Sequence, residues 1–174
     1  EYPYKTILQQ STCESIAYNL KELGFGTHVI HNNTGTFYDR HLVFPNLGFD
    51  SFTSLEYMNH VDKKPLGWAK DTILTTEIIK SLLSTDQRDF VYAISVQPHG
   101  KYPSSPLGDE HPITVSSDVI SEQDLVPFSY YVNQLYEEDA FLRSLIESLE
   151  TYGEPTVLIL YGDHLPSISA AEEY

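Results

Sequence analysis

Short runs of apolar residues recur along the chain and predict buried β-strands. They occupy residues 27–31, 90–96 and 156–160, and each is rich in branched or aromatic side chains. Apolar residues at helical spacing lie around them, in the segments 16–23, 71–83 and 125–152. Helices that alternate with buried strands are typical of a mainly parallel sheet with helices on both faces. We therefore expect an α/β fold for residues 1–174.

Cap and turn residues predict where the helices begin. Ser11 and Glu14 have the capping-box spacing ahead of the first helix, and Asp71 or Thr72 is placed to cap the second. Pro127 lacks an amide hydrogen, which is tolerated in the first turn of a helix. The third helix is therefore expected to begin near residue 125.

Two irregular segments and one acidic residue complete this prediction. Residues 46–60 are aromatic and polar without a clear period, which indicates a loop with a short strand or helix. Residues 102–119 contain three prolines and predict a long loop, a candidate lid. Asp139 interrupts the apolar stripe of the third helix, so we expect a buried acceptor that braces a neighbouring loop, with a catalytic role as a minor alternative.

Histidine or aspartate follows each of the three predicted strands. His31 ends the first, His99 follows the second, and Asp163 and His164 follow the third across a glycine. Parallel strands present their carboxyl ends at one edge of a sheet, so these side chains are expected to converge there. Aspartate and histidine are natural ligands of a divalent cation. Taken singly, a histidine at a strand end is more often a hydrogen-bonded turn residue than a ligand, and Asp-His after a glycine is often a turn, so only their recurrence favours a functional site.

Two residues behind the first strand are candidates for binding an anion. Arg40 can hold an anionic oxygen with its planar guanidinium, although a surface ion pair is an equal alternative. Tyr38 can donate a hydrogen bond or stack on a ligand, but this chain has 13 Tyr and 8 Phe, and many of them fill core and surface. The remaining histidines are assigned to structure or solvent, and they are His28, His41, His60 and His111.

Composition limits the partners of the chain. With 41% hydrophobic and 20% charged residues, 174 residues are enough for a globular core. The 25 acidic against 10 basic residues give a net charge of -15, which argues against a nucleic-acid partner because such proteins present a cationic face. Cys13 is the single cysteine, so the sequence contains no internal disulfide. No apolar run reaches the 18 residues of a membrane-spanning helix.

Three motifs together resemble the sulfatase-like branch of the alkaline phosphatase superfamily. They are Tyr-Gly-Asp-His-Leu-Pro at 161–166, His31 followed by Thr-Phe-Tyr-Asp-Arg at 36–40, and Gln-Pro-His-Gly-Lys-Tyr-Pro at 97–103. Within that branch the chain is most similar to lipoteichoic acid synthases and related phosphoglycerol transferases. The resemblance covers nearly the whole chain, and it implies an alkaline phosphatase-like domain of which residues 1–174 are the C-terminal part.

The resemblance also implies a divalent metal, manganese or zinc, with magnesium as a further alternative. The family's metal ligands are a glutamate, a nucleophilic threonine and an Asp-His pair, of which this chain matches the pair as Asp163 and His164. The glutamate and the threonine are expected upstream, so no catalytic nucleophile is assigned here and the chain alone is expected to be inactive. The positions that the resemblance implies for substrate binding are His31, Tyr38, Arg40, His99 and Ser167.

The implied activity is transfer of phosphoglycerol, or a similar head group, from a membrane phospholipid to an envelope glycan or polymer. It would take place on the extracellular face of the cytoplasmic membrane, in a full-length protein that is membrane-anchored. The alternatives are a sulfatase or a phosphoethanolamine transferase of the same superfamily. A non-catalytic module that binds cell-wall carbohydrate is an alternative of another class, since the chain is aromatic and lacks the nucleophile.

Overall fold

The computed structural model describes residues 11–108 and 112–168. The chain divides into two compact units. The first contains the described residues up to Asp62 together with Ala69–Val96. The second contains Lys63–Trp68 and the described residues from Gln97 onward. His111, one of the histidines assigned to structure or solvent, lies outside the described residues.

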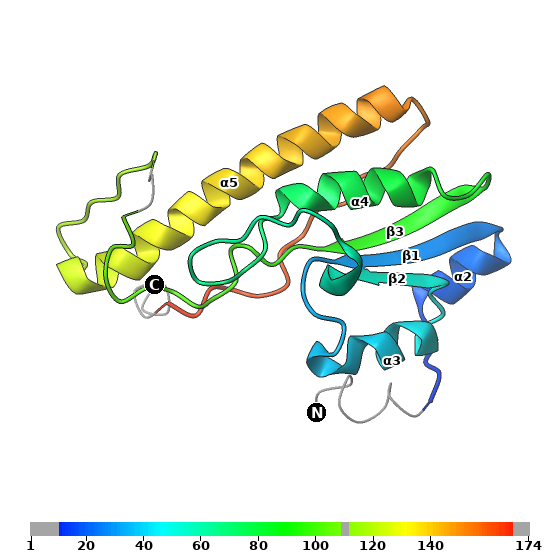
Figure 1. Ribbon diagram of the computed structural model, residues 1–174, viewed down its shortest axis with the longest axis horizontal. Helices are drawn as coiled ribbons and strands as arrows, with labels where there is room; N and C mark the ends of the chain where they lie inside the picture. The colour runs from blue at the N-terminus through cyan, green and yellow to red at the C-terminus, as the bar shows by residue number, and fades with distance from the viewer. Residues whose placement is uncertain (1–10, 109–111, 169–174) are drawn as a thin grey trace. The chain divides into compact units, whose positions relative to one another are not determined.

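The first unit is built on a parallel sheet of three strands in the order β2-β1-β3 (Figure 1). The central strand β1 (Phe25–His31) is buried along nearly its whole length. It pairs with β2 (Ser51–Ser54) and with β3 (Arg88–Ile94). The strands predicted at 27–31 and 90–96 are therefore confirmed. β3 is only partly buried, because it lies at an edge of the described sheet.

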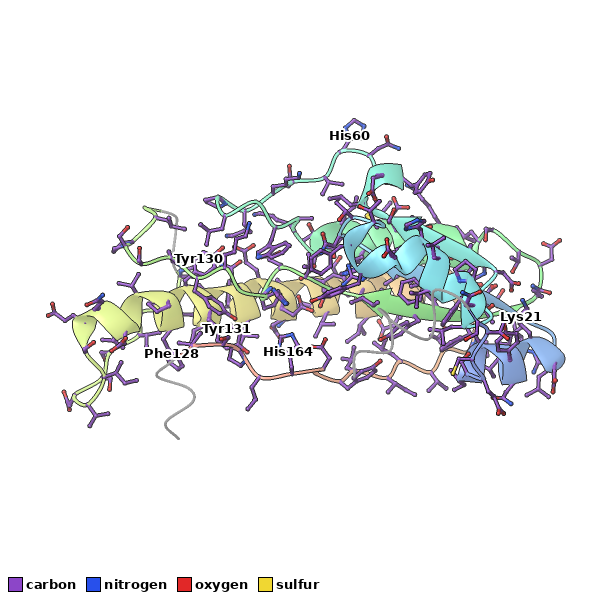
Figure 2. The ribbon with its side chains drawn as sticks, turned by 90° about the horizontal axis from the view of Figure 1, so that it is seen from below. Lys21, His60, Phe128, Tyr130, Tyr131 and His164 are labelled. Atoms are coloured by element: carbon purple, nitrogen blue, oxygen red, sulfur yellow. The ribbon has the colours of Figure 1, made fainter. Side chains whose placement is uncertain are left out.

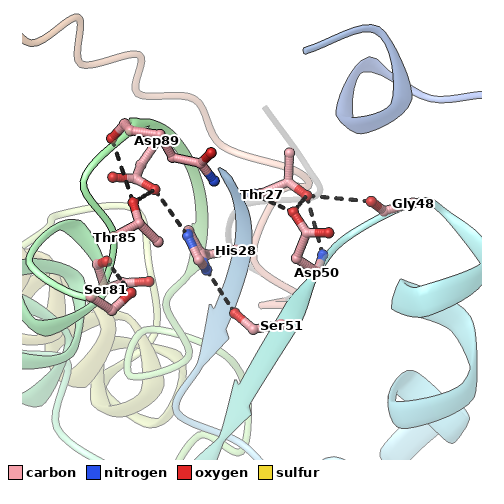
Figure 3. A network of polar contacts seen from close by, with 10 residues as sticks. Thr27, His28, Gly48, Asp50, Ser51, Ser81, Thr85 and Asp89 are labelled. Atoms are coloured by element: carbon pink, nitrogen blue, oxygen red, sulfur yellow. Dashed lines mark hydrogen bonds and ion pairs between the residues drawn. The ribbon is translucent and has the colours of Figure 1, made fainter. Parts of the chain in front are cut away.

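Helices pack on this sheet as the sequence predicts. In Figure 3, a helix on each side flanks the strands, with the green α4 (Thr72–Leu82) on one side and the cyan α3 (Arg40–Asn46) on the other. The core of the unit consists of apolar side chains that are almost fully buried, namely Ala17, Val29, Ile30, Val43, Phe44 and Leu74. Two single turns of 3-10 helix, η1 (Phe37–Asp39) and η2 (Leu55–Tyr57), connect the main elements.

The helix caps differ from those predicted. The first helix, α2 (Ile16–Glu22), begins four residues later than the capping box indicates, because the Ser15 hydroxyl and not that of Ser11 accepts the amide hydrogen of Ala17. Asp71 precedes α4 but its side chain makes no cap hydrogen bond. Asp71 is almost fully buried, and its carboxylate binds Asn32 and Val96 instead.

Polar side chains around His28 join the three strands of the sheet (Figure 3). The His28 ring contacts the Ser51 hydroxyl at Nδ1 (2.7 Å) and the Asp89 carboxylate at Nε2 (3.1 Å). The Thr85 hydroxyl donates to the same carboxylate oxygen at 2.8 Å. Both ring nitrogens of His28 are thus engaged by side chains of the fold, which agrees with a structural role for this residue.

The second unit is dominated by the long helix α5 (Glu122–Tyr152) (Figure 1). The Ser121 hydroxyl caps its start, and Gly153 ends it with a left-handed φ of 81°. The helix begins three residues before the predicted start, so Pro127 lies in the second turn instead of the first.

The described part of residues 102–119 is irregular, as predicted, and lies against α5. An apolar pocket between them is lined by Pro103, Pro106, Leu107, Val115, Leu125, Val126, Ser129 and Tyr130.

The strand predicted at residues 156–160 is absent. This segment has no regular secondary structure, and Val157 and Ile159 are 87% and 76% exposed. A strand that is apolar on both faces is stable only between two neighbouring strands, and no described strand pairs with it. Among the described helices, none is both long and apolar enough to cross a bilayer.

Candidate active site

In the first unit, His31 occupies the carboxyl end of β1 and is almost fully buried. Its Nδ1 lies 2.8 Å from the carbonyl oxygen of Ile94, the last residue of β3. A carbonyl only accepts, so Nδ1 carries the hydrogen and the neutral ring has its lone pair on Nε2. The neighbouring strand therefore fixes both the orientation and the tautomer of this ring.

Tyr38 and Arg40 lie in the turn that follows β1. Tyr38 and Asp39 both have left-handed backbone conformations, with φ of 57° and 52°, which are uncommon for residues with a side chain. The Arg40 guanidinium carbon lies 5.1 Å from the ring centroid of Phe37 and 5.7 Å from that of Tyr38. These distances fit cation–π contacts, which hold the planar guanidinium against the turn.

Glu56 anchors the start of the same turn. Both of its carboxylate oxygens accept the amide hydrogen of Gly35 at 3.1 Å. A hydrogen bond from Ser54 and those from the backbone outweigh the opposing effect of burial and hold the pKa of Glu56 below its ordinary value. A Cβ atom at Gly35 would lie 3.1 Å from the Ser54 hydroxyl oxygen, so the turn fits closely against η2 and the end of β2. Nothing in the sequence pattern pointed to Glu56.

In the second unit, His99 lies in an irregular turn and is exposed. Its ring contacts that of Trp68 edge-on, with centroids 5.5 Å apart, and that of His164, with centroids 5.4 Å apart. The Lys101 ammonium lies 5.6 Å from the centroid of Trp68. The Tyr102 hydroxyl donates to the carbonyl oxygen of Pro98 at 3.2 Å, and burial raises the pKa of this phenol. We call Trp68, His99, Lys101, Asp163 and His164 the His99 group.

The Asp163 and His164 side chains have the chemistry of two metal ligands. Nδ1 of His164 donates to the carbonyl oxygen of Leu165 at 2.8 Å, which leaves the lone pair of the neutral ring on Nε2. This nitrogen lies 3.7 Å from Oδ1 of Asp163. Tetrahedral zinc, with bonds of about 2.0–2.1 Å, places two ligand atoms about 3.3 Å apart. A small rotation of either exposed side chain would bring both atoms onto one cation.

The described residues supply only part of a metal site. No group of three or more His, Cys, Asp or Glu side chains able to hold a metal ion occurs within residues 11–108 and 112–168. Asp163 and His164 thus fit half of a ligand set. Both are exposed on the segment that carries the label of His164 in Figure 2. Ser167, expected to bind substrate, is exposed on the same segment.

The expected convergence of the site residues remains a prediction. His31, Tyr38 and Arg40 belong to the first unit, whereas His99, Asp163, His164 and Ser167 belong to the second. Within the second unit the structure brings His99 and His164 together.

The expectation for Asp139 is wrong. Its side chain is 74% exposed and lies 3.7 Å from Arg143 one turn later, so it points away from the core. The acceptor that braces neighbouring loops is Glu137, which binds Lys64 and Gln97. A helical turn spans 3.6 residues, so a shift of two positions moves a side chain to the opposite side of the helix.

Comparison with known families identifies the family of this chain. Residues 1–174 match the sulfatase family along their whole length. The chain belongs to the sulfatase family. It is 29% identical over 167 residues to the putative cyclic beta-1,2-glucan modification protein of Rhizobium meliloti (strain 1021), and 28% identical over 153 residues to the capsular polysaccharide biosynthesis protein RkpI of the same organism. These stretches cover 96% and 87% of the chain but 26% of each relative, so the chain spans about a quarter of their length.

Solved structures show the same fold at low sequence identity. The phosphoglycerol transferase GacH of Streptococcus pyogenes, in complex with sn-glycerol-1-phosphate, has a TM-score of 0.70 at 23% identity and matches 83% of this chain and 38% of its own. The lipoteichoic acid synthase LtaP of Listeria monocytogenes has a TM-score of 0.66 at 20% identity and matches 85% of this chain and 36% of its own. The C-terminal periplasmic domain of EptC from Escherichia coli, in complex with Zn, has a TM-score of 0.56 at 19% identity and matches 79% of this chain and 39% of its own. The α/β fold predicted from the sequence, as part of an alkaline phosphatase-like domain, is thereby confirmed.

Proposed function

We propose that this chain is part of a metal-dependent phosphotransferase that moves phosphoglycerol, or a similar head group, from a membrane phospholipid to a cell-envelope acceptor. The observation that carries the proposal is the His99 group. In a chain of the sulfatase family, Asp163 and His164 present two facing ligand atoms 3.7 Å apart, and the His99 ring lies against His164.

Similar proteins support the chemical class of donor and acceptor. GacH is a phosphoglycerol transferase solved with sn-glycerol-1-phosphate. The two Rhizobium relatives are named for modifying a cyclic glucan and for capsular polysaccharide biosynthesis. A phosphodiester donor and a glycan hydroxyl as acceptor therefore fit both sets of similarities. The reaction would take place on the extracellular face of the cytoplasmic membrane.

The metal is proposed to be manganese or zinc, with Asp163 and His164 as two of its ligands. When bound, it would supply positive charge for the phosphoryl oxygens and lower the pKa of a hydroxyl nucleophile. The Leu165 carbonyl holds the His164 ring in the tautomer whose Nε2 is free to bind a cation. The remaining ligands and the threonine nucleophile are proposed to lie upstream of this chain.

The chain's own residues would bind and orient the transferred group. Arg40 has the guanidinium geometry to bind two phosphoryl oxygens, and the turn anchored by Glu56 presents it beside Tyr38. His99 donates Nδ1–H to the carbonyl oxygen of Gly100 at 2.7 Å, so its Nε2 can accept a hydroxyl proton. His31 and Ser167 are proposed to contact the head group. Together these groups favour an anionic ligand in an otherwise acidic chain.

Metal binding and transfer can be tested separately in the full-length protein. Titration calorimetry with MnCl₂ and ZnCl₂ should detect binding that Asp163→Ala and His164→Ala abolish, while Asp139→Ala on the exposed side of α5 leaves it intact. Transfer from phosphatidylglycerol to a glucan acceptor should be lost in the same two variants. If the unaltered protein binds neither metal and transfers no phosphodiester, the enzyme proposal fails and a glycan-binding module becomes the better explanation. If Asp163→Ala keeps full activity, Asp163 is not a ligand of the catalytic metal.

Phosphoethanolamine transfer is the second candidate function, because the family match does not specify the head group that is transferred. Sulfatase activity is the third candidate function, because the family match alone does not distinguish a phosphate ester from a sulfate ester as substrate. Parallel assays with phosphatidylglycerol, phosphatidylethanolamine and an aryl sulfate ester distinguish the three activities. Higher turnover of the second or third substrate would replace the phosphoglycerol assignment.

A further inference from the structure

A buried polar network lies behind His99 in the second unit. Glu137 of α5 accepts hydrogen bonds from the Lys64 ammonium at Oε1 (2.8 Å) and from the Gln97 amide at Oε2 (2.6 Å). The Gln97 amide also donates to Oε1 of Gln134, one turn earlier on α5, at 3.0 Å. Lys64 is 8% exposed, and Gln97 and Gln134 are buried still more completely. One carboxylate therefore binds two different segments of chain with its two oxygens.

Both of these segments lead directly to the His99 group. Gln97 is separated from His99 by Pro98, whose ring restricts the backbone between them. Lys64 begins a tight turn in which its amide hydrogen binds the Trp68 carbonyl oxygen at 2.8 Å, and its carbonyl oxygen binds the Gly67 amide hydrogen at 2.8 Å. Trp68 at the end of this turn contacts His99. Glu137 thus supports both sides of one aromatic contact.

We propose that Glu137 is a positioning residue that holds His99 in place through Gln97 and through the turn from Lys64 to Trp68. The inference rests on the proposed function, in which His99 contacts the transferred group. The Lys64 ammonium and the Gln97 amide are buried, whereas the Glu137 side chain is 32% exposed. The two contacts make a stiff support, because breaking either one takes a charged acceptor from a buried donor. His99 itself is exposed and needs such support, since its own hydrogen bond reaches only the adjacent residue.

Substitutions along α5 separate this role from general effects on the helix. Glu137→Gln removes the charge that pairs with Lys64 and leaves one oxygen for two donors. Asp139→Asn makes the same chemical change two residues later, at an exposed position. Gln97→Met keeps the length of the side chain and the Lys64–Glu137 ion pair, but removes the hydrogen bonds that the Gln97 amide donates to Glu137 and Gln134. This second variant introduces no unpaired charge, so it keeps the test decisive if Glu137→Gln does not fold.

The test records the His99 ring resonances by NMR and the kinetics of phosphodiester transfer, both in the full-length protein. Glu137→Gln and Gln97→Met should shift the His99 resonances and raise KM for the donor about tenfold, with a smaller change in kcat, whereas Asp139→Asn should change neither. Unchanged His99 resonances in both variants would overturn the proposal. If the resonances shift but the unaltered protein transfers no phosphodiester, the positioning role stands and the proposed function fails.

Discussion

The Asp71 carboxylate accepts a hydrogen bond of 2.6 Å from the side-chain amide of Asn32, the residue that follows His31. The same oxygen, Oδ1, accepts the backbone amide hydrogen of Val96 at 2.9 Å. Asn32 leaves β1 and Val96 follows β3, so one buried carboxylate ties together the carboxyl ends of two neighbouring strands. His31 precedes Asn32 in the chain, and its Nδ1 binds the carbonyl oxygen of Ile94, the last residue of β3.

Asp71→Ala is therefore expected to destabilise the protein by about 2–4 kcal/mol, because two buried donors lose a charged acceptor. Urea unfolding followed by circular dichroism measures the change. Asp86→Ala, at an exposed position beyond α4, is the matched control and should change the free energy of unfolding by less than about 0.5 kcal/mol. Equal effects of the two substitutions would contradict the role assigned to Asp71.

Gly26→Ala should weaken the polar network around His28. A Cβ atom at Gly26 would lie 2.6 Å from Oδ1 of Asp89 and 3.0 Å from Nε2 of His28, so these buried groups would have to move apart. We expect a loss of about 1–3 kcal/mol, measured by thermal unfolding. Gly162→Ala, where an added Cβ has no atom within 4 Å, serves as the control. An unaffected melting temperature in Gly26→Ala would show that the network is loosely held.

Stability should fall at acid pH through Asp50. Burial raises the pKa of this carboxyl, but hydrogen bonds from Lys21 and Thr27 outweigh it and hold the pKa below its ordinary value of 3.8. A pKa lowered by folding stabilises the protein above the pKa of the unfolded chain, and this stabilisation disappears as pH falls through the folded value. Asp50→Asn should therefore cost about 0.5–1 kcal/mol at pH 7 after allowance for solvent screening, and progressively less as the pH falls below 3.8. A difference that does not depend on pH would assign the effect to packing.

Arg40→Lys should lower activity although it preserves charge. A lysine ammonium cannot make the two parallel hydrogen bonds to a phosphoryl group that a guanidinium makes, and it would also alter the contacts with Phe37 and Tyr38. In the full-length protein we expect kcat/KM for the phosphodiester to fall at least about tenfold, with little change in melting temperature. Wild-type kcat/KM in this variant would remove Arg40 from the proposed site.

Local patterns were sufficient to predict β1, β3, α2, α4 and α5, whereas the strand predicted at 156–160 is absent and β2 was expected only as a short strand or helix within residues 46–60. The branched residues around Val29 and Val91, and the apolar stripe of α4, specify their elements because each packs against neighbours that this chain itself supplies. Helix starts were less accurate, since Ser11 and Ser15 are equally good capping residues and tertiary contacts choose between them.

The candidate site was predictable only where residues lie close in sequence to a strand end. His31 is at the end of β1 as expected, but the residues that hold the site were missed, because Glu137, Asp71 and Glu56 act on partners between 21 and 73 positions away. Spacing along one element cannot reveal such contacts. The error at Asp139 has the same origin, since its apolar neighbours on α5 did not define the buried side of the helix.

The exposed run from Val157 to Tyr161 has a consequence for handling the polypeptide. Five consecutive apolar residues without a charge or proline, extended and open to solvent, are the kind of segment through which chains associate into intermolecular sheets. Purified by itself, the 174-residue polypeptide should therefore show concentration-dependent self-association. Replacing Ile159, on its most exposed side, with lysine should improve solubility without loss of helix content.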